Sequence, residues 1–308
     1  MALVSLPDTE WIEQVGPIEG IEQIAWDILS PSGREDEIEL VVPPYMGDRS
    51  PLVALKGLPR LRAVQLLSAG YEDVLPLVPP GVRLANAAGV HDASTAELAV
   101  GLALATLRGI PQMVRAQEER TWAELGGRRS LADRRVLILG YGSVGRAVAR
   151  RLVGFEVGMT AVASRARAGD EFVDRVHGVD ELPELLPRHD VVIVIVPLTE
   201  RTQGMVDADF LARMPAGSVL VNVARGAVVD THALLRACAS GRLQAALDVT
   251  DPEPLPPEHP AWTTPGVLIS PHVGGFTTAF WPRAVALLRA QLTRFGQGGP
   301  LHHVVHPA

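Results

Sequence analysis

The architecture of this chain is best predicted from Val136-Leu137-Ile138-Leu139-Gly140-Tyr141-Gly142-Ser143-Val144-Gly145-Arg146-Ala147-Val148. The aliphatic residues indicate a buried strand, the Gly-x-Gly-x-x-Gly run a tight turn, and the residues after it a helix. Gly140 allows the turn, Gly142 lets the backbone approach a pyrophosphate, and Gly145 lets the helix pack on the strand. Because a helix amino terminus attracts phosphates, the stretch predicts dinucleotide binding.

Strands and helices alternate regularly after this turn. The expected strands are continuous apolar runs, which indicate a parallel sheet covered on both faces. This pattern is typical of a Rossmann-type doubly wound α/β domain. The expected elements are a helix at 144–153, strands at 159–163, 191–196, 218–223, 244–249 and 267–270, and helices at 208–214 and 232–240.

The first hundred residues show a smaller α/β pattern. Ser94-Thr95-Ala96-Glu97 has the spacing of a capping box, which predicts a helix that ends near Gly109, with Glu97 as a cap. Short apolar runs separated by turns precede it. They predict strands at 3–6, 38–42, 61–67 and 82–85 and a helix at 51–58.

Two segments are expected to be irregular. Residues 113–135 are polar and contain Trp122, which suits an exposed excursion, either plain monomer surface or a subunit-contact arm. Residues 251–260 are rich in proline, so they predict a rigid loop without regular structure.

The composition narrows the function classes. The 308 residues carry a net charge of -7 and no basic run, which argues against a nucleic-acid partner. The one cysteine, Cys238, permits no disulfide framework and favours a reducing compartment. The first residues lack the features of a signal peptide, and the apolar segment 96–110 is too short to span a bilayer. We therefore expect a cytoplasmic protein without a membrane partner, and no metal site is predicted.

Polar side chains follow three of the expected strands. Arg225 comes after the strand that ends near Asn222, Asp251 and Glu253 come after the next, and His272 comes after the last. Ligands of open parallel sheets bind outside the carboxyl ends of the strands. These side chains are therefore expected to lie on one rim, although each alone suits a surface or turn position equally well.

The residue types suit the reduction of a ketone by hydride. A planar guanidinium, Arg225, is well suited to clamp a carboxylate beside the carbonyl. Histidine titrates near neutral pH, so His272 is expected to act as general acid in reduction and as base in oxidation. A neighbouring carboxylate, Glu253 or Asp251, would favour the protonated imidazole and orient it.

These residues, in this order, resemble the D-isomer-specific 2-hydroxyacid dehydrogenase family, in particular its NADPH-dependent glyoxylate/hydroxypyruvate reductase branch. The resemblance covers almost the whole chain. In that family the arginine of Ala-Arg-Gly, the glutamate of Glu-Pro and the histidine after proline form the catalytic set, which implies Arg225, Glu253 and His272. The matching motifs are Asn86 to Gly89, Ser94 to Glu97, the Gly140 turn, Val196 to Thr199, Asn222 to Gly226, Asp248 to Pro254, and Ser270 to His272.

The resemblance also implies a discontinuous, flavodoxin-like substrate domain, formed by residues 1–97 and 276–308, with a dinucleotide-binding domain at 98–275 inserted in it. It implies that backbone donors of Ser68, Ala69 and Gly70 hold the substrate carboxylate, and that Asp248 accepts a hydrogen bond from the cofactor carboxamide. A homodimer is expected by the same analogy. The cofactor positions it implies, beside Gly140, Gly142 and Gly145, are Ser143, Val144, Pro197, Thr202, Val223, Ala224, Asp248 and Gly275.

One departure concerns the choice of cofactor. NAD-preferring proteins place an acidic residue about twenty residues after the glycine turn, where it binds the ribose hydroxyls. Here that place reads Ala163-Ser164-Arg165-Ala166-Arg167. A hydroxyl and a guanidinium, from Ser164 and Arg165, would bind a ribose phosphate, unless the arginines are ordinary surface charges. NADP(H) is therefore predicted over NAD(H), which stays possible.

Two alternatives remain. A nucleotide-sensing binding protein of the same fold would bind the cofactor without turnover, but it would have no need of a proton donor such as His272. A formate or phosphite dehydrogenase is disfavoured, because the formate enzymes lack the glutamate and the phosphite enzymes carry a lysine in the loop that here reads Ser68-Ala69-Gly70. The preferred hypothesis is a reductase of a small 2-oxo acid such as glyoxylate or hydroxypyruvate.

Overall fold

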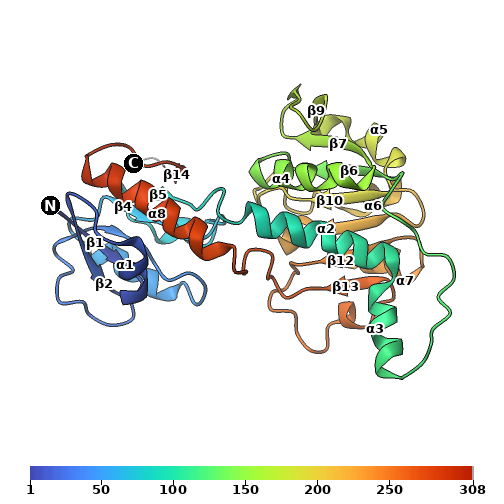
Figure 1. Ribbon diagram of the computed structural model, residues 1–308, viewed down its shortest axis with the longest axis horizontal. Coiled ribbons are helices and arrows are strands. Elements are labelled where there is room, and N and C mark those ends of the chain that lie inside the picture. The colour runs from blue at the N-terminus through green and yellow to red at the C-terminus, as the bar shows by residue number, and fades with distance from the viewer. Residues whose placement is uncertain (307–308) are drawn as a thin grey trace. The chain divides into compact units, whose positions relative to one another are not determined.

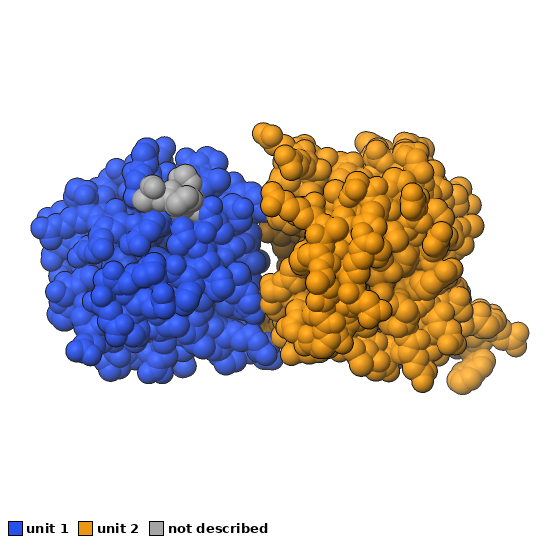
Figure 2. All heavy atoms as spheres, turned by 90° about the horizontal axis from the view of Figure 1, so that it is seen from above, with its two compact units in different colours: residues 1–91, 278–308 blue, residues 92–277 orange. Residues whose placement is uncertain are grey.

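The computed structural model describes residues 1–306 and divides the chain into two compact units (Figures 1 and 2). Unit 1 combines residues 1–91 with the chain from Thr278 onward, and unit 2 comprises Asp92–Thr277. The expected boundaries at 97/98 and 275/276 differ by a few residues. The reason is helix α2 (Asp92–Arg108), which is continuous and buries Ala96, Ala99 and Ala103 in the core of unit 2.

Unit 2 contains an eight-stranded sheet in the order β13-β12-β11-β10-β6-β7-β9-β8. Every pairing is parallel except that of β8 with β9. The predicted doubly wound α/β fold is therefore confirmed. The strands are β6 (Arg135–Leu139), β7 (Gly158–Ala163), β8 (Arg167–Ala168), β9 (Arg175–Gly178), β10 (Val191–Val194), β11 (Val219–Asn222), β12 (Gln244–Leu247) and β13 (Val267–Ile269).

Both faces of this sheet are covered, which explains why its central strands are apolar throughout. Alternate residues of β6 enter different cores: Val136 and Ile138 pack with α2 and α4 (Ser143–Leu152), whereas Leu137 and Leu139 pack on the opposite side. That side is covered by α5 (Leu182–Leu185), α6 (Ala208–Arg213) and α7 (Thr231–Ala239), together with short 3-10 helices at 186–188 and 226–228. Further 3-10 helices lie at 153–155, where Phe155 packs on the side of α2 and α4, and at 179–181 and 260–262.

Unit 1 contains a six-stranded sheet in the order β14-β5-β4-β3-β1-β2, parallel except for β14. The observed order β2-β1-β3-β4-β5 is that of the expected flavodoxin-like α/β unit. Its elements are β1 (Ala2–Leu6), α1 (Thr9–Val15), β2 (Ile21–Ala25), β3 (Ile38–Val41), 3-10 helices at Ser50–Gly57 and Leu75–Leu77, β4 (Ala63–Gln65), β5 (Arg83–Ala85), α8 (Phe280–Gly296) and β14 (Val304–His306).

Helix α8 returns the chain to unit 1 and covers its sheet. Phe280, Ala284, Leu288 and Leu292 are buried at intervals of four residues, which is the signature of a helix face. Behind it, the buried Gln291 donates to Gln65 Oε1 at 2.5 Å and to the His302 carbonyl at 2.9 Å. These bonds fix the segment that leads to β14 against the sheet.

Three local expectations are corrected. Helix α2 begins at Asp92, so Ser94 lies inside it and donates to or accepts from Thr277 at 2.6 Å instead of forming a capping box. Glu97 pairs with Arg151 of α4 at 3.0 Å rather than with its own backbone. The expected excursion after residue 113 begins as helix α3 (Ile110–Glu118), because its residues are good helix formers on an amphipathic pattern. Within the expected excursion, residues 119–134, which we name the arm, lack helix and strand.

Candidate active site

The carboxyl ends of β11, β12 and β13 lie next to one another in the sheet of unit 2. Arg225 follows β11, Glu253 follows β12 and His272 follows β13. The structure therefore brings the three sequence-predicted side chains to the same rim.

The loop that carries His272 is held by a buried carboxylate. Asp248 is 3% exposed, and its two oxygens accept hydrogen bonds from the Val273 N–H at 3.0 Å and the Gly274 N–H at 2.9 Å. The Ser270 hydroxyl donates to the same carboxylate at 2.7 Å. The His272 N–H donates to the Asp248 carbonyl at 2.8 Å, although His272 itself has a φ of 54°. The loop thus stabilises a left-handed backbone conformation that histidine rarely adopts.

The imidazole of His272 faces Glu253. Its Nδ1 donates to Glu253 Oε1 at 2.5 Å, and this hydrogen bond is the largest cause that raises the pKa of His272, against the lowering effect of burial. The same bond lowers the pKa of Glu253. The pair therefore favours an imidazolium beside a carboxylate.

Arg225 lies at a turn formed by the end of β11. The buried Asn222 accepts from the Ala224 N–H at 3.0 Å and donates to the Arg225 carbonyl at 3.0 Å. Nη1 of Arg225 donates to the Ala224 carbonyl at 2.7 Å. The positive charge of Arg225 contributes to lowering the pKa of both Glu253 and His272, which places the guanidinium in the field of the pair.

A cavity of about 840 Å³ follows the glycine turn on the same sheet. Gly140 has a φ of 109°, and a Cβ there would lie 2.5 Å from the Ile195 carbonyl oxygen. A Cβ on Gly145 would overlap the Gly140 carbonyl oxygen, whereas a Cβ on Gly142 would meet open space. Larger residues would therefore clash with the backbone at Gly140 and Gly145, and the space beside Gly142 is open. This arrangement fits the close approach of a dinucleotide.

Several predicted cofactor residues line this cavity and others do not. Gly140, Gly142, Ser164, Pro197 and Thr202 line it, and the Thr202 hydroxyl donates to the Pro197 carbonyl at 2.6 Å. Arg165 is exposed and is absent from the lining. The arginines that line the cavity are Arg167 and Arg201.

The remaining predicted cofactor positions lie along the same edge. Ser143 and Val144 begin α4, and the Ser143 hydroxyl donates to Asp92 at 3.1 Å. Val223 and Ala224 are buried directly after β11, and Gly275 follows the His272 loop. The structure shows a contact of Asp248 that the sequence did not suggest: its carboxylate accepts hydrogen bonds from the backbone of the His272 loop.

The predicted substrate loop belongs to unit 1. It follows β4, and Ser68 donates from its hydroxyl to the Gly70 carbonyl at 2.8 Å. Asn86 donates to the Ala69 carbonyl at 2.7 Å, and the Ala87 N–H donates to the Ser68 carbonyl at 2.9 Å. These donors engage the carbonyls of the loop within unit 1 itself.

Within residues 1–306, no group of three or more His, Cys, Asp or Glu side chains is arranged to hold a metal ion. Over the same residues, no single helix is long and apolar enough to cross a membrane. α2 and α3 meet the length and composition criteria only as a pair bent by 67°.

Comparison with known proteins identifies the family. Residues 100–274 match the family model of the D-isomer specific 2-hydroxyacid dehydrogenase NAD binding domain. The human glyoxylate reductase/hydroxypyruvate reductase is 34% identical over 225 residues, covering 70% of this chain and 68% of that protein.

Two solved structures extend the likeness to both units. A D-isomer specific 2-hydroxyacid dehydrogenase from Xanthobacter autotrophicus Py2, in complex with NADPH and MES, has a TM-score of 0.83 and 28% identity, covering 99% of this chain and 98% of that chain. An NADPH-dependent glyoxylate/hydroxypyruvate reductase from Sinorhizobium meliloti, in complex with NADP and sulfate, has a TM-score of 0.82 and 27% identity over the same shares. The chain belongs to the D-isomer specific 2-hydroxyacid dehydrogenase family and is an oxidoreductase.

Proposed function

We propose that this enzyme reduces a small 2-oxo acid of the glyoxylate or hydroxypyruvate type with NADPH. The observation that carries the proposal is the pairing of His272 with Glu253 beside Arg225 at three adjacent strand ends. The names of the human and Sinorhizobium meliloti relatives support this substrate class.

The proposed mechanism divides the work among the three side chains. When bound, the reduced nicotinamide supplies a hydride to the substrate carbonyl carbon. Arg225 holds the carboxylate and polarises the carbonyl through its fork of N–H donors. His272 donates a proton from Nε2 to the oxygen that gains charge, and Glu253 stabilises the imidazolium before that step and orients the ring.

We propose that the Ser68-Ala69-Gly70 loop binds the carboxylate of the substrate. Its carbonyls are engaged by Asn86 and Ala87, so its N–H groups remain as the donors that a carboxylate requires.

For the cofactor, we propose that the 2′-phosphate of NADPH binds between Ser164 and Arg167. Both side chains line the cavity beside the glycine turn, whereas Arg165, the arginine chosen from the sequence, does not. The relatives from Xanthobacter autotrophicus and Sinorhizobium meliloti were solved with NADPH and NADP, which supports the same choice here.

We also propose that the enzyme is a cytoplasmic homodimer, joined through α3 and the arm. Trp122 is 95% exposed, and a cavity of about 1050 Å³ lies between α3 and the arm. A two-fold interface must be complementary to itself, and this surface presents both signs of charge beside its apolar side chains. The exposed residues concerned are Ile110, Met113, Val114, Trp122, Arg115, Arg120, Glu118 and Glu124.

The test of the reaction is the rate of cofactor oxidation with NADPH and with NADH against glyoxylate, hydroxypyruvate, pyruvate and a bulky aromatic 2-oxo acid. We expect turnover on a small acid with preference for NADPH. Tight cofactor binding without turnover would favour the nucleotide-sensing alternative. Reduction of NADP⁺ by formate or phosphite would favour the corresponding dehydrogenases.

A further inference from the structure

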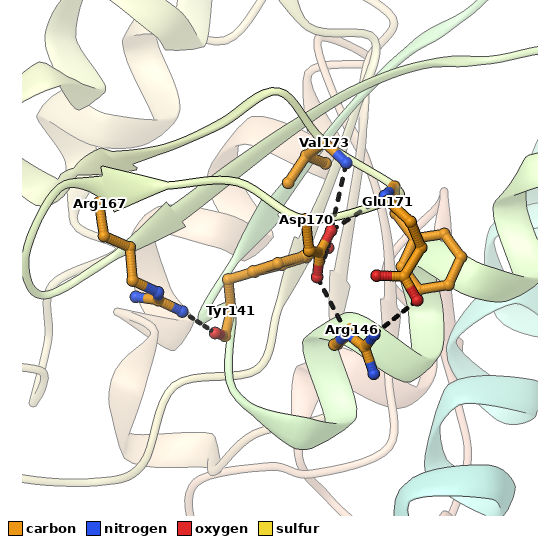
Figure 3. Close-up of polar contacts among 7 residues, drawn as sticks. Tyr141, Arg146, Arg167, Asp170, Glu171 and Val173 are labelled. Carbon is orange, nitrogen blue, oxygen red and sulfur yellow. Dashed lines mark hydrogen bonds and ion pairs between the residues drawn. The ribbon is translucent and has the colours of Figure 1, made fainter.

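The hairpin formed by β8 and β9 lies beside the glycine turn and carries Arg167 (Figure 3). Arg167 lies at its first position, and its Nη2 donates to the Tyr141 carbonyl at 2.5 Å. Arg167 and Tyr141 both line the cavity of about 840 Å³ and a second cavity of about 370 Å³. The guanidinium therefore lies against the glycine turn, at a position that both cavities reach.

Arg167 has little support from the sheet itself. β8 pairs with β9 through only two residues, Arg167 with Val176 and Ala168 with Arg175. Arg167 is an exposed side chain on an edge strand. A long exposed arginine loses considerable rotamer freedom when it is fixed, so its position depends on what holds the hairpin to the glycine turn.

Tyr141 supplies that connection from inside the Gly-Tyr-Gly sequence. Tyr141 is 5% exposed, and its hydroxyl donates to the carboxylate of Asp170. The hydroxyl oxygen lies 3.0 Å from Oδ1 and 3.2 Å from Oδ2. Burial, together with the hydrogen bond to Asp170, raises the pKa of Tyr141, so the hydroxyl remains a donor. The carbonyl and the hydroxyl of one residue thus hold two points of the hairpin: Arg167, the first residue of β8, and Asp170, in the segment between β8 and β9.

The carboxylate of Asp170 also accepts hydrogen bonds from backbone N–H groups of its own turn and from α4. Burial would raise its pKa, but hydrogen bonds from the Phe172 N–H at 3.0 Å, the Tyr141 hydroxyl and Arg146 Nε at 3.0 Å outweigh that effect, and the pKa is lowered. Arg146 lies in the first turn of α4 and also reaches Glu171 at 2.6 Å. In Figure 3, Tyr141 and Arg146 point toward Asp170 from two elements.

We propose that Tyr141 and Asp170 are positioning residues that hold Arg167 for the 2′-phosphate of NADPH, so that a side chain inside the glycine turn controls cofactor selectivity. This inference rests on the proposed function, because it requires Arg167 to meet the phosphate. A network with a merely structural role would affect NADPH and NADH equally, since both cofactors use the same glycine turn.

The test compares Tyr141→Phe and Asp170→Asn with the unchanged enzyme. For each, kcat/KM is measured with NADPH and with NADH at a fixed concentration of the same 2-oxo acid, and cofactor Kd values are measured by fluorescence. We expect the NADPH-to-NADH ratio of kcat/KM to fall about three- to tenfold, the size expected for loss of one hydrogen bond. The fall should reside in KM and Kd for NADPH rather than in kcat.

Two further variants make the result interpretable. Arg175→Ala changes an exposed arginine of the same hairpin that pairs with Glu181, and it should leave the ratio unchanged. Tyr141→Phe added to Arg167→Ala should lower the ratio no further than Arg167→Ala alone, because the tyrosine acts through the arginine.

The outcomes separate the two proposals. If Arg167→Ala lowers the ratio but Tyr141→Phe and Asp170→Asn lower NADPH and NADH efficiency equally, the positioning role is wrong and the phosphate site stands. If Arg167→Ala leaves the ratio unchanged, the phosphate site itself is wrong. If Tyr141→Phe does not fold, Asp170→Asn decides alone by the same criterion.

Discussion

The loops after β11, β12 and β13 are held by buried polar side chains, whereas the glycine turn and the β8–β9 hairpin are joined by the buried Tyr141 together with an exposed ion-pair network. On the first side, Asn222 and Asp248 are 1% and 3% exposed and bond to nearby backbone N–H groups. On the second, the side chain of Arg146 is 52% exposed and that of Glu171 is 57% exposed. Buried hydrogen bonds thus hold the loop of the proposed proton donor, and exposed ion pairs contribute to holding the proposed phosphate site. We call the region of the three loops the rigid side and the region of the glycine turn and hairpin the adjustable side.

This difference has a physical reason. Buried hydrogen bonds to a carboxylate are costly to lose, so they hold a strained residue such as His272 at a fixed φ of 54°. Exposed ion pairs are screened by water and contribute little each. General acid catalysis needs exact placement of a proton, whereas the choice between two cofactors needs only a modest difference in binding energy.

The largest effect is expected for His272→Ala on the rigid side. Removing the imidazole removes the proton donor, and kcat should fall about 10²- to 10⁴-fold. The affinity for NADPH should change little, because His272 is separate from the cavity that follows the glycine turn. Steady-state kinetics and cofactor fluorescence titration measure the two quantities. Retention of full activity would show that another group donates the proton.

Arg225→Lys should have the next largest effect. Lysine keeps the charge but loses the fork of N–H donors, so kcat/KM for the 2-oxo acid should fall about 10- to 100-fold. Arg236→Lys, on the exposed side of α7, is the matched control and should behave as the unchanged enzyme. Equal behaviour of the two variants would contradict the proposed role of Arg225.

Glu253→Gln tests the electrostatic coupling of the pair. The pKa of His272 is raised chiefly by its bond to Glu253, and reduction needs the protonated ring. Activity in reduction is therefore present below this raised pKa and lost as pH rises through it. Without the carboxylate the pKa falls, so the loss should occur at lower pH. Profiles of kcat/KM recorded from about pH 5 to about pH 9 measure the shift, and superimposable profiles would exclude the coupling.

On the adjustable side, Arg167→Ala should lower the preference for NADPH over NADH by about tenfold, since a charge-assisted bond to phosphate is lost. Arg165→Ala is a close control from the same loop, because Arg165 does not line the cavity. The ratio of kcat/KM for the two cofactors is measured for both variants. A larger effect from Arg165 would restore the choice made from the sequence.

The smallest effect is expected for Glu171→Gln. Its ion pair with Arg146 is exposed on both sides and screened by water, so the urea midpoint of unfolding should stay within experimental error of that of the unchanged enzyme. Urea unfolding measures the change. A fall of the midpoint well outside that error would mean that the hairpin is held as rigidly as the loop of His272.

The sequence predicted the rigid side better than the adjustable one. Arg225, Glu253 and His272 each follow a strand that periodicity reveals, and parallel strands bring their carboxyl ends together. The roles of Asn222 and Asp248 could have been suspected from their place at strand ends, but their bonding partners are backbone groups that no pattern specifies.

The adjustable side depended on tertiary contacts. Tyr141 and Asp170 lie 29 residues apart, and nothing in their spacing predicts that they meet. Arg165 was preferred from its spacing alone, and no sequence pattern predicts the two-residue strand β8, from which Arg167 reaches the Tyr141 carbonyl. The choice between the two arginines stays a prediction. Glu97 matched a capping box, but α2 begins earlier and the side chain pairs with Arg151 instead. Helix α8 was missed although its four-residue interval of buried side chains is visible in the sequence.

The most direct measurement compares His272→Ala with Arg167→Ala in one experiment that records kcat for a small 2-oxo acid and Kd for NADPH. The separation of proton transfer from cofactor choice predicts opposite results: His272→Ala loses kcat and keeps NADPH affinity, and Arg167→Ala keeps kcat at saturating cofactor and loses NADPH affinity. If both variants lost both quantities together, or if His272→Ala kept its kcat, the assignment of chemistry to one side and selectivity to the other would be wrong.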